Sequence, residues 1–302
     1  ARTVRLTADL QKIDLQGKVI MPGLVDTHSH IGEPAGADGS GPIQPDVRIL
    51  VSVNARAAST QRAQSGGITT ANVMPGSGSL NSGQTLYLKL RDGAIKIDDL
   101  LIYDEKGNYA GGIKFANGTN PIRPGGGNFP GTRAKSAALV RDQFIKAKEY
   151  QAKIVKAGSD LTKLPPRDLS MEALVEVLEG KRVVHFHTHR HDDIMTALRL
   201  QKEFGFKIVL QHVSEAWKVA DEIAKAKVPS SIIMIDSPGG KIETVEVSMS
   251  NGAALEKSGA LVGFHTDDQI TDSRWNGSSF WDVARKITLR NDDGWCNYVG
   301  YG

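Results

Sequence analysis

Apolar, strand-like runs alternate with helix-like segments along most of the chain, starting near Lys18. The helix-like segments space small apolar residues among Arg, Lys and Gln, whereas the strand-like runs are short and rich in Val and Ile. Such alternation is typical of βαβ units with parallel strands. The expected strands are 18–25, 68–74, 111–116, 182–187, 206–212, 231–235 and 260–265, with one more inside 85–90 or 100–103. The expected helices are 49–65, 134–156, a short one after Ser170, 192–204 and one starting at Ser214.

The number and order of these elements predict an α/β fold of the (β/α)₈ TIM-barrel type. A barrel of about 250 residues would use most of a chain of 302 residues. We therefore expect one large domain over 18–272, preceded by a short N-terminal remnant at 1–17 and followed by a C-terminal tail at 273–302. Residues 117–133 are rich in Gly, Pro and Asn and predict a long loop.

Charge and cysteine usage narrow the expected partners. The net charge is +3 and the chain contains no run of five like charges, so neither nucleic acid nor a membrane surface is an expected partner. The single cysteine, Cys296, excludes an internal disulfide and a zinc site built from several cysteines. A small-molecule substrate is the partner that remains.

Histidines close several of the expected strands. His28 and His30 are two positions apart at the end of the first strand, so their side chains share one face. His187 and His212 each end an apolar run, and Asp267 follows the last one. The carboxyl ends of barrel strands carry the active site, and buried histidines and carboxylates need partners. These five residues therefore predict a metal site, because imidazole and carboxylate are common metal ligands.

Two motifs resemble the amidohydrolase superfamily. GKVIMPGLVDTHSH, which contains His28 and His30, is similar to the family's entry into its barrel, and GFHTDD, which contains Asp267, is similar to its final metal-binding motif. The resemblance extends from about Gly17 to Asp272 and is closest to the imidazolonepropionase-like and dipeptidase-like branch. It implies a metal-dependent hydrolase with one or two divalent ions per chain, with zinc expected.

The resemblance also implies a role for each residue of the site. His28 and His30 would hold the more buried metal, and His187 and His212 the more exposed one. Asp267 would contact the metal and act as the general base. Lys114 matches the strand-four lysine that bridges two metals as a carbamate in binuclear members; a plain lysine, either at the edge of the core or in a salt bridge, is the alternative.

His189 and Arg190 follow His187 and leave two interpretations open. Either they are exposed loop residues, or one of them contacts a carboxylate of the substrate, for which Arg offers a bidentate donor.

The chain departs from the family at both ends of the predicted barrel. Relatives carry a small β-sandwich built from segments before and after the barrel, and here we expect it to be absent or vestigial. Its loss would expose barrel surface, so we expect the chain to associate as a homo-oligomer.

Three functions fit these patterns. The leading one is hydrolysis of an amide bond in a dipeptide, an N-acyl amino acid or a cyclic amide by a metal-activated hydroxide. The same site could attack a lactone, a phosphotriester or an aminated ring, the last as a ring deaminase. A truncated barrel that binds metal without turnover is the third, and the intact set of predicted ligands argues against it.

Overall fold

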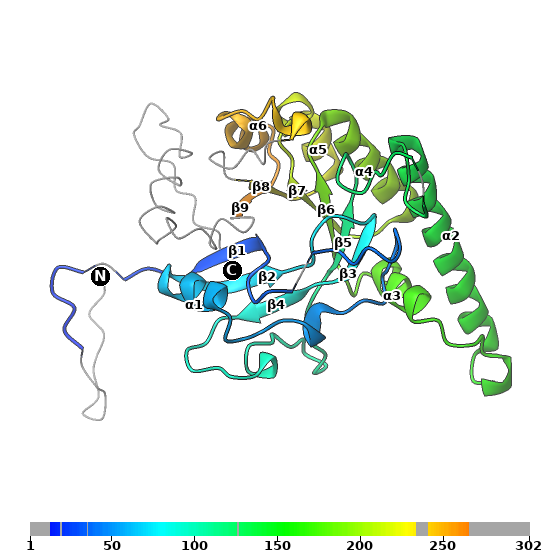
Figure 1. The fold of residues 1–302 in the computed structure, drawn as a ribbon, viewed down its shortest axis with the longest axis horizontal. Helices are drawn as coiled ribbons and strands as arrows, with labels where there is room; N and C mark the ends of the chain where they lie inside the picture. The colour runs from blue at the N-terminus through cyan, green and yellow to red at the C-terminus, as the bar shows by residue number, and fades with distance from the viewer. Residues whose placement is uncertain (1–12, 19, 35, 126, 234–240, 266–302) are drawn as a thin grey trace.

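The computed structural model describes residues 13–18, 20–34, 36–125, 127–233 and 241–265, and its elements form a mixed α/β fold (Figure 1). The strands in this part are β1 (Leu24–Ser29), β2 (Ile68–Val73), β3 (Asn81–Gln84), β4 (Leu86–Lys89), β5 (Ile113–Ala116), β6 (Val184–Thr188), β7 (Ile208–His212), β8 (Ser230–Ile233) and β9 (Val262–His265). The α-helices are α1 (Ala58–Ser65), α2 (Arg133–Ala157), α3 (Leu169–Leu178), α4 (His191–Phe204), α5 (Ala220–Ala226) and α6 (Asn251–Lys257). Single 3₁₀ turns are η1 (Ile49–Val51), η2 (Ile97–Asp99), η3 (Leu161–Lys163), η4 (Ala216–Lys218) and η5 (Ile242–Thr244).

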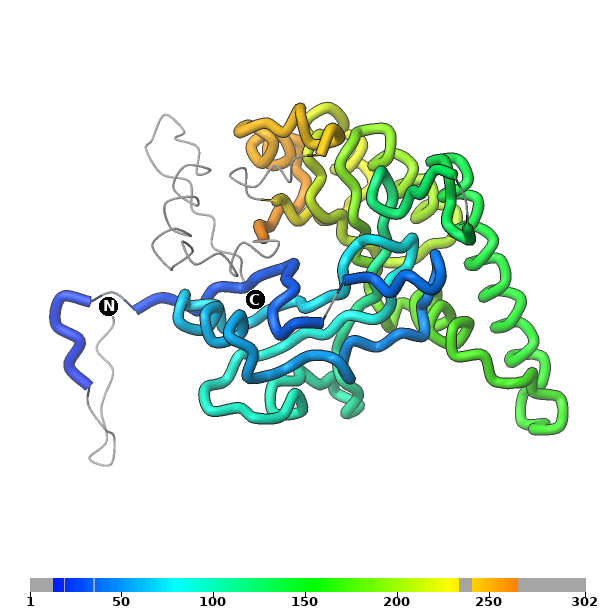
Figure 2. Tube along the Cα trace, in the orientation of Figure 1, coloured from blue at the N-terminus to red at the C-terminus, as the bar shows by residue number. Residues whose placement is uncertain are grey.

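The strands pair in two sheets. Five strands, β5 to β9, run parallel in chain order, and β3 joins the edge of this sheet antiparallel to β5. The second sheet has the order β1-β2-β4, with β1 parallel and β4 antiparallel to β2. The continuous trace shows how the chain passes from the smaller sheet into β5 and then through successive strand–helix units (Figure 2).

Side-chain hydrogen bonds join the two sheets where β1 lies beside β9. The hydroxyl of Thr27 on β1 donates to the carbonyl oxygen of Phe264 on β9 over 3.0 Å. The same hydroxyl lies 2.5 Å from the Ser231 hydroxyl on β8. The first strand is therefore held against the last two.

The element order agrees with the sequence-based prediction, whereas several boundaries and the strand count differ. The first strand begins at Leu24 rather than Lys18, after Pro22 and Gly23, and its last residue precedes His30. The described residues form nine strands rather than eight, because the 81–89 region contributes both β3 and β4. The uncertain strand thus lies within 85–90, while 100–103 makes only isolated bridges.

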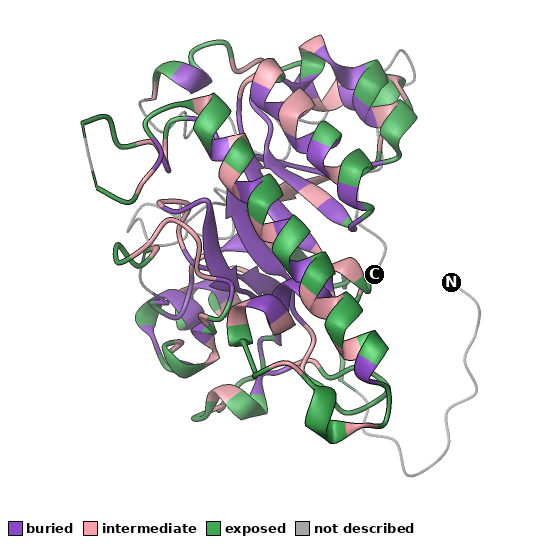
Figure 3. Ribbon diagram, turned by 90° about the vertical axis from the view of Figure 1, so that its right-hand side faces the viewer, coloured by how far each residue is buried: buried purple, intermediate pink, exposed green. Residues whose placement is uncertain are grey.

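The two faces of the parallel sheet have opposite character. On β5 and β6, Phe115 and Phe186 point to the side covered by α2, α3 and α4 and belong to a large apolar cluster. Alternation therefore directs Lys114, His185 and His187 to the opposite, inner side of the sheet. Strands β5, β6 and β8 are buried at every residue, while α2 keeps an exposed outer face (Figure 3). The fold thus buries polar side chains on one face of an otherwise apolar sheet.

Stacked aromatic rings fix α2, the longest helix, onto this sheet. The ring of Phe144 is fully buried and lies 5.7, 5.1 and 4.9 Å from the rings of Phe115, Phe204 and Phe206 respectively. Thr132 begins the helix, since its side chain accepts a hydrogen bond from the Lys135 amide. Among the described helices, none combines the length and apolarity needed to cross a membrane.

Replacing Phe144 with Ala should lower the free energy of unfolding by about 3–5 kcal/mol, because it leaves a cavity among three other aromatic rings. Equilibrium urea denaturation measures this loss. Ile145→Ala is the matched control on the same helix. Its side chain is 43% exposed, so the change should stay within about 0.5 kcal/mol. Equal losses in both variants would contradict the packing described.

Candidate metal centre

Histidines gather on the inner face of the sheet, at the carboxyl ends of its strands. Of the eight histidines in the chain, six are buried: His28, His185, His187, His189, His212 and His265. They come from β1, β6, β7 and β9 or from the residue just after a strand. Histidine is rarely concentrated in a protein interior, and buried imidazoles need polar partners or a metal. These histidines are therefore the candidate functional residues of the described part of the chain.

His28 and His30 turn the same ring nitrogen toward each other. His30 donates from Nδ1 to the carbonyl oxygen of Met74 over 2.6 Å, and His28 donates from Nδ1 to the side-chain oxygen of Gln211 over 3.1 Å. In neutral imidazoles both Nε2 atoms are then acceptors, and they lie 3.3 Å apart. Two nitrogens bound to one tetrahedral zinc ion at about 2.0–2.1 Å would also lie about 3.3 Å apart.

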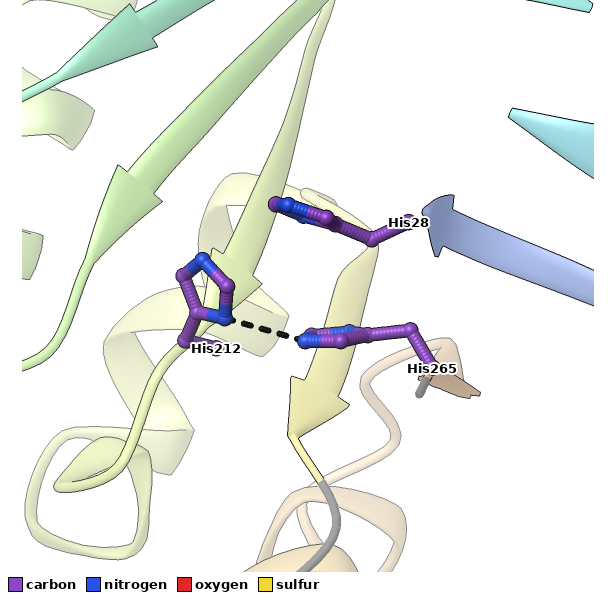
Figure 4. Close-up of side chains that lie close together, drawn as sticks. All are labelled: His28, His212 and His265. Atoms are coloured by element: carbon purple, nitrogen blue, oxygen red, sulfur yellow. Dashed lines mark hydrogen bonds between the residues drawn. The ribbon is translucent and has the colours of Figure 1, made fainter. Parts of the chain in front are cut away.

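A chain of hydrogen bonds orients His265 and His212, and its last bond, between these two rings, is drawn in Figure 4. The Thr27 hydroxyl donates a hydrogen bond to the Phe264 carbonyl oxygen. Its own oxygen can therefore accept a hydrogen bond from the Ser231 hydroxyl. Ser231 in turn accepts from Nδ1 of His265 over 2.7 Å. His265 therefore accepts at Nε2 from Nδ1 of His212, over 2.9 Å. One backbone carbonyl thus fixes two tautomers and leaves Nε2 of His212 as an acceptor.

His212 reaches this cluster through an unusual backbone conformation. It ends β7 with φ of +71°, and Val213 follows with φ of +42°. Side chains rarely adopt this left-handed region, and each such residue costs on the order of 1–3 kcal/mol. Strict alternation would place His212 with Ile208 and Leu210, which face the helices. The bend turns its ring instead toward His28, with ring centres 4.5 Å apart.

Lys114 lies beside the histidines and is completely buried. Its Nζ is 3.1 Å from Nε2 of His28 and 3.2 Å from Sδ of Met74. The position on β5 is where the resemblance places a bridging lysine, and the amine is within reach of the same His28 nitrogen that faces His30. Its role stays a prediction.

Two groups of donors have the spacing of metal ligands. Candidate ligand atoms of His28, His212 and His265 lie within 4.8 Å of one another, and so do those of His187, His189 and Glu243. The groups adjoin, because the rings of His187 and His212 are centred 4.4 Å apart. Imidazole nitrogens with one carboxylate suit zinc and other first-row divalent metals. The donors therefore fit a divalent cation.

His185 lies behind the cluster and takes part in fixing it. Gln211, which accepts from His28, donates from its amide nitrogen to Nδ1 of His185, and the other ring nitrogen is 2.9 Å from the Tyr87 hydroxyl. Burial, helped by the charge of Lys114, lowers the pKa of His185 to about 3, so its ring is neutral. Burial also raises the pKa of Tyr87 to about 12. Burial likewise holds the pKa of His212 well below its usual range, with neighbouring histidines adding to the effect.

The structure brings together most of the residues predicted from the sequence. His28, His30, Lys114, His187 and His212 converge on the inner face. Asp267 lies outside the described residues. His189 is buried against Ser214, so the exposed-loop interpretation is wrong for this residue.

Arg190 behaves differently from its neighbour His189. Its guanidinium pairs with Asp192 over 2.8 Å, and both side chains are about two-fifths exposed. The exposed interpretation thus describes Arg190 better than a place inside the cluster does.

Two residues of the donor groups were not predicted as ligands from the sequence. His265 ends β9, and the same strand-end argument that selected His187 and His212 would have selected it. Glu243 lies in η5, in no strand or long helix, and nothing in the local pattern distinguishes it.

Comparison with known proteins finds a similar solved structure. The chain is similar to a crystal structure titled as an amidohydrolase from Thermotoga maritima MSB8, with a TM-score of 0.79 and 29% sequence identity. The match covers 94% of this chain and 78% of the other. Neither a family model nor a curated protein sequence matches the chain.

Acid should destabilise the fold through His185. Its folded-state pKa of about 3 lies below the ordinary value of 6.5, so the unfolded chain takes up the proton first as pH falls. This contribution is fully present above pH 6.5 and is lost between pH 6.5 and 3. His185→Asn should therefore reduce the slope of unfolding free energy against pH by up to about 1.4 kcal/mol per pH unit. Urea titrations of the chelator-treated protein and variant between these pH values measure this slope. The same slope in both proteins would contradict the prediction.

Ser231→Ala should weaken zinc binding by about 10–100-fold, because it removes the acceptor that orients His265 and, through it, His212. Competition with a chromophoric chelator measures the affinity. Ser230→Ala is a matched control, since Ser230 is equally buried on the same strand but its hydroxyl has no hydrogen-bond partner among the described residues. An identical effect in the two variants would refute the orienting chain.

Proposed function

The chain belongs to the amidohydrolase superfamily, and from this premise we propose that it is a metal-dependent hydrolase that cleaves an amide bond of a small substrate. One observation carries the proposal. Imidazoles from β1, β6, β7 and β9 meet on the inner face of the sheet, and the Nε2 atoms of His28 and His30 face each other as acceptors. Facing acceptors repel unless a cation lies between them, so this arrangement is one that a metal ion stabilises.

The proposed fold and ligand set follow the family. We propose that the two sheets are parts of one (β/α)₈ barrel, which the hydrogen bonds of Thr27 to Ser231 and Phe264 support at the β1–β9 contact. We assign zinc as the metal, held by His28 and His30 with His212 and His265 close by. When bound, such a metal supplies hydroxide near neutral pH and polarises a carbonyl group.

The protein's own residues would position these reactants. Gln211 and the Met74 carbonyl hold the rings of His28 and His30 in the tautomer that keeps Nε2 unprotonated. Ser231 does the same for His265, and the left-handed backbone at His212 sets the direction of that ring. Outer hydrogen bonds of this kind raise the basicity of ligands and fix their orientation. The site is therefore preorganised before a metal arrives.

Lys114 and Asp267 complete the proposal. Lys114, whose Nζ lies beside His28, would carry the carbamate that the resemblance implies: its ammonium would lose two protons as the nitrogen bonds to CO₂, and a cation would become a two-oxygen anion that could hold a metal. Asp267 would accept the proton of the attacking hydroxide and return it to the leaving nitrogen, the two halves of general acid–base catalysis. An amide is the simplest bond that uses both steps.

Metal content and hydrolysis together test the function. Protein purified without chelator should contain at least one zinc ion per chain by plasma mass spectrometry. It should also hydrolyse members of a panel of dipeptides, N-acyl amino acids and cyclic amides. Asp267→Asn should keep the metal and lower kcat by about 100-fold or more, since general acid–base catalysis contributes about 10²–10⁴-fold.

Three results bear on the assignment in different ways. Full activity of Asp267→Asn would remove Asp267 as the base. Turnover of lactones, phosphotriesters or aminated rings, with no cleavage of amides, would replace the substrate class. Protein that binds no metal even after reconstitution would contradict the function itself.

A further inference from the structure

Glu243 places a carboxylate beside the histidines, in addition to the ligands that the resemblance implies. It belongs to η5, and its side chain is entirely buried. A carboxylate oxygen of Glu243 and ring nitrogens of His187 and His189 lie within 4.8 Å of one another. The three come from the segment before α6 and from the end of β6.

The loop after β5 is built around the Glu243 carboxylate. Oε2 accepts a hydrogen bond from the backbone amide of Thr119 over 2.9 Å. Gly118 has φ of +75°, and a Cβ there would lie 2.6 Å from Oε2, so glycine is required for this approach. Oε1 is buried and has no hydrogen-bond partner among the described residues. One oxygen is therefore anchored, and the other is available to a ligand.

The charged side chains around Glu243 carry a formal net negative charge. Arg133 Nη2 lies 3.5 Å from Oε2, but the same guanidinium makes a shorter ion pair, of 2.8 Å, with Asp193. The two carboxylates and one guanidinium sum to one negative charge. Because an uncompensated buried charge is costly, this group favours a positively charged ligand.

His189 is oriented as a ligand would be. Its Nδ1 is 2.8 Å from the Ser214 hydroxyl, which leaves Nε2 to face the cluster. The ring stacks on His212 at 5.0 Å and meets His187 edge-on at 4.7 Å. A side chain fixed on one nitrogen by a hydroxyl is the usual setting of a metal-bound histidine.

We propose that Glu243, His187 and His189 hold a second divalent cation next to the one at His28 and His30. The inference rests on the proposed function for that first metal. It differs from the ligand set implied by the resemblance, in which His187 acts with His212. Glu243 is the carboxylate of this group, so it would supply negative charge beside the cation.

A crystal structure of the zinc-loaded protein, with anomalous diffraction collected at the zinc edge, tests this directly. We expect a second anomalous peak at about 2.0–2.2 Å from a Glu243 carboxylate oxygen and from a nitrogen of His189. In solution, Glu243→Gln should lose one zinc equivalent per chain. The matched control is Glu246→Gln, because Glu246 is 55% exposed and pairs with Lys218 at the surface; it should keep the full content.

The outcomes separate this inference from the proposed function. A single peak at His28 and His30 together with hydrolysis would overturn the second site and leave the function intact. Two peaks, one at Glu243, without hydrolysis of any substrate would support the second site and count against the function. Glu243→Gln that keeps the full zinc content would overturn the inference, and if this variant fails to fold, the anomalous map of the unsubstituted protein decides.

Discussion

Imidazoles buried at close range constrain the whole inner face of this protein. A neutral imidazole carries one donor and one acceptor nitrogen, so each buried ring needs an acceptor for its proton before the other nitrogen can face a neighbour. Here the acceptors are the Met74 carbonyl for His30, Gln211 for His28 and Ser231 for His265. Each is supplied by a different strand or strand end, so the tautomers depend on the register of the sheets.

The join between the sheets is therefore also part of the site. Thr27 links β1 to β9 by donating to the Phe264 carbonyl, and this same bond sets the direction of the hydrogen bonds through Ser231 to His265 and His212. A shift of β1 by one residue would remove the hydroxyl from this position and turn His28 to the other face. Thr27 therefore couples the packing of the two sheets to the orientation of His265 and His212, which it reaches through Ser231.

Alternation in the sequence predicted the part of the site that lies on regular strands. His28, His30 and His187 follow from strand ends, whereas Lys114 follows from the resemblance alone. His212 also follows from a strand end, although its ring direction depends on a left-handed residue that no periodicity encodes. Short polar β3, Asn81–Gln84, has no hydrophobic alternation, which is why a strand was missed and the count was too low. Glu243 could not be predicted, because its place depends on a tertiary contact with the Gly118–Thr119 turn.

The central claim is that these imidazoles bind a metal through nitrogen. X-ray absorption spectroscopy at the zinc edge of the loaded protein measures the ligands without requiring a substrate. The account predicts a first shell of nitrogen and oxygen at about 2.0–2.1 Å with the outer-shell scattering of several imidazole rings. A first shell of oxygen alone, with no imidazole scattering, would show that the histidines are only a buried polar network and would contradict the account.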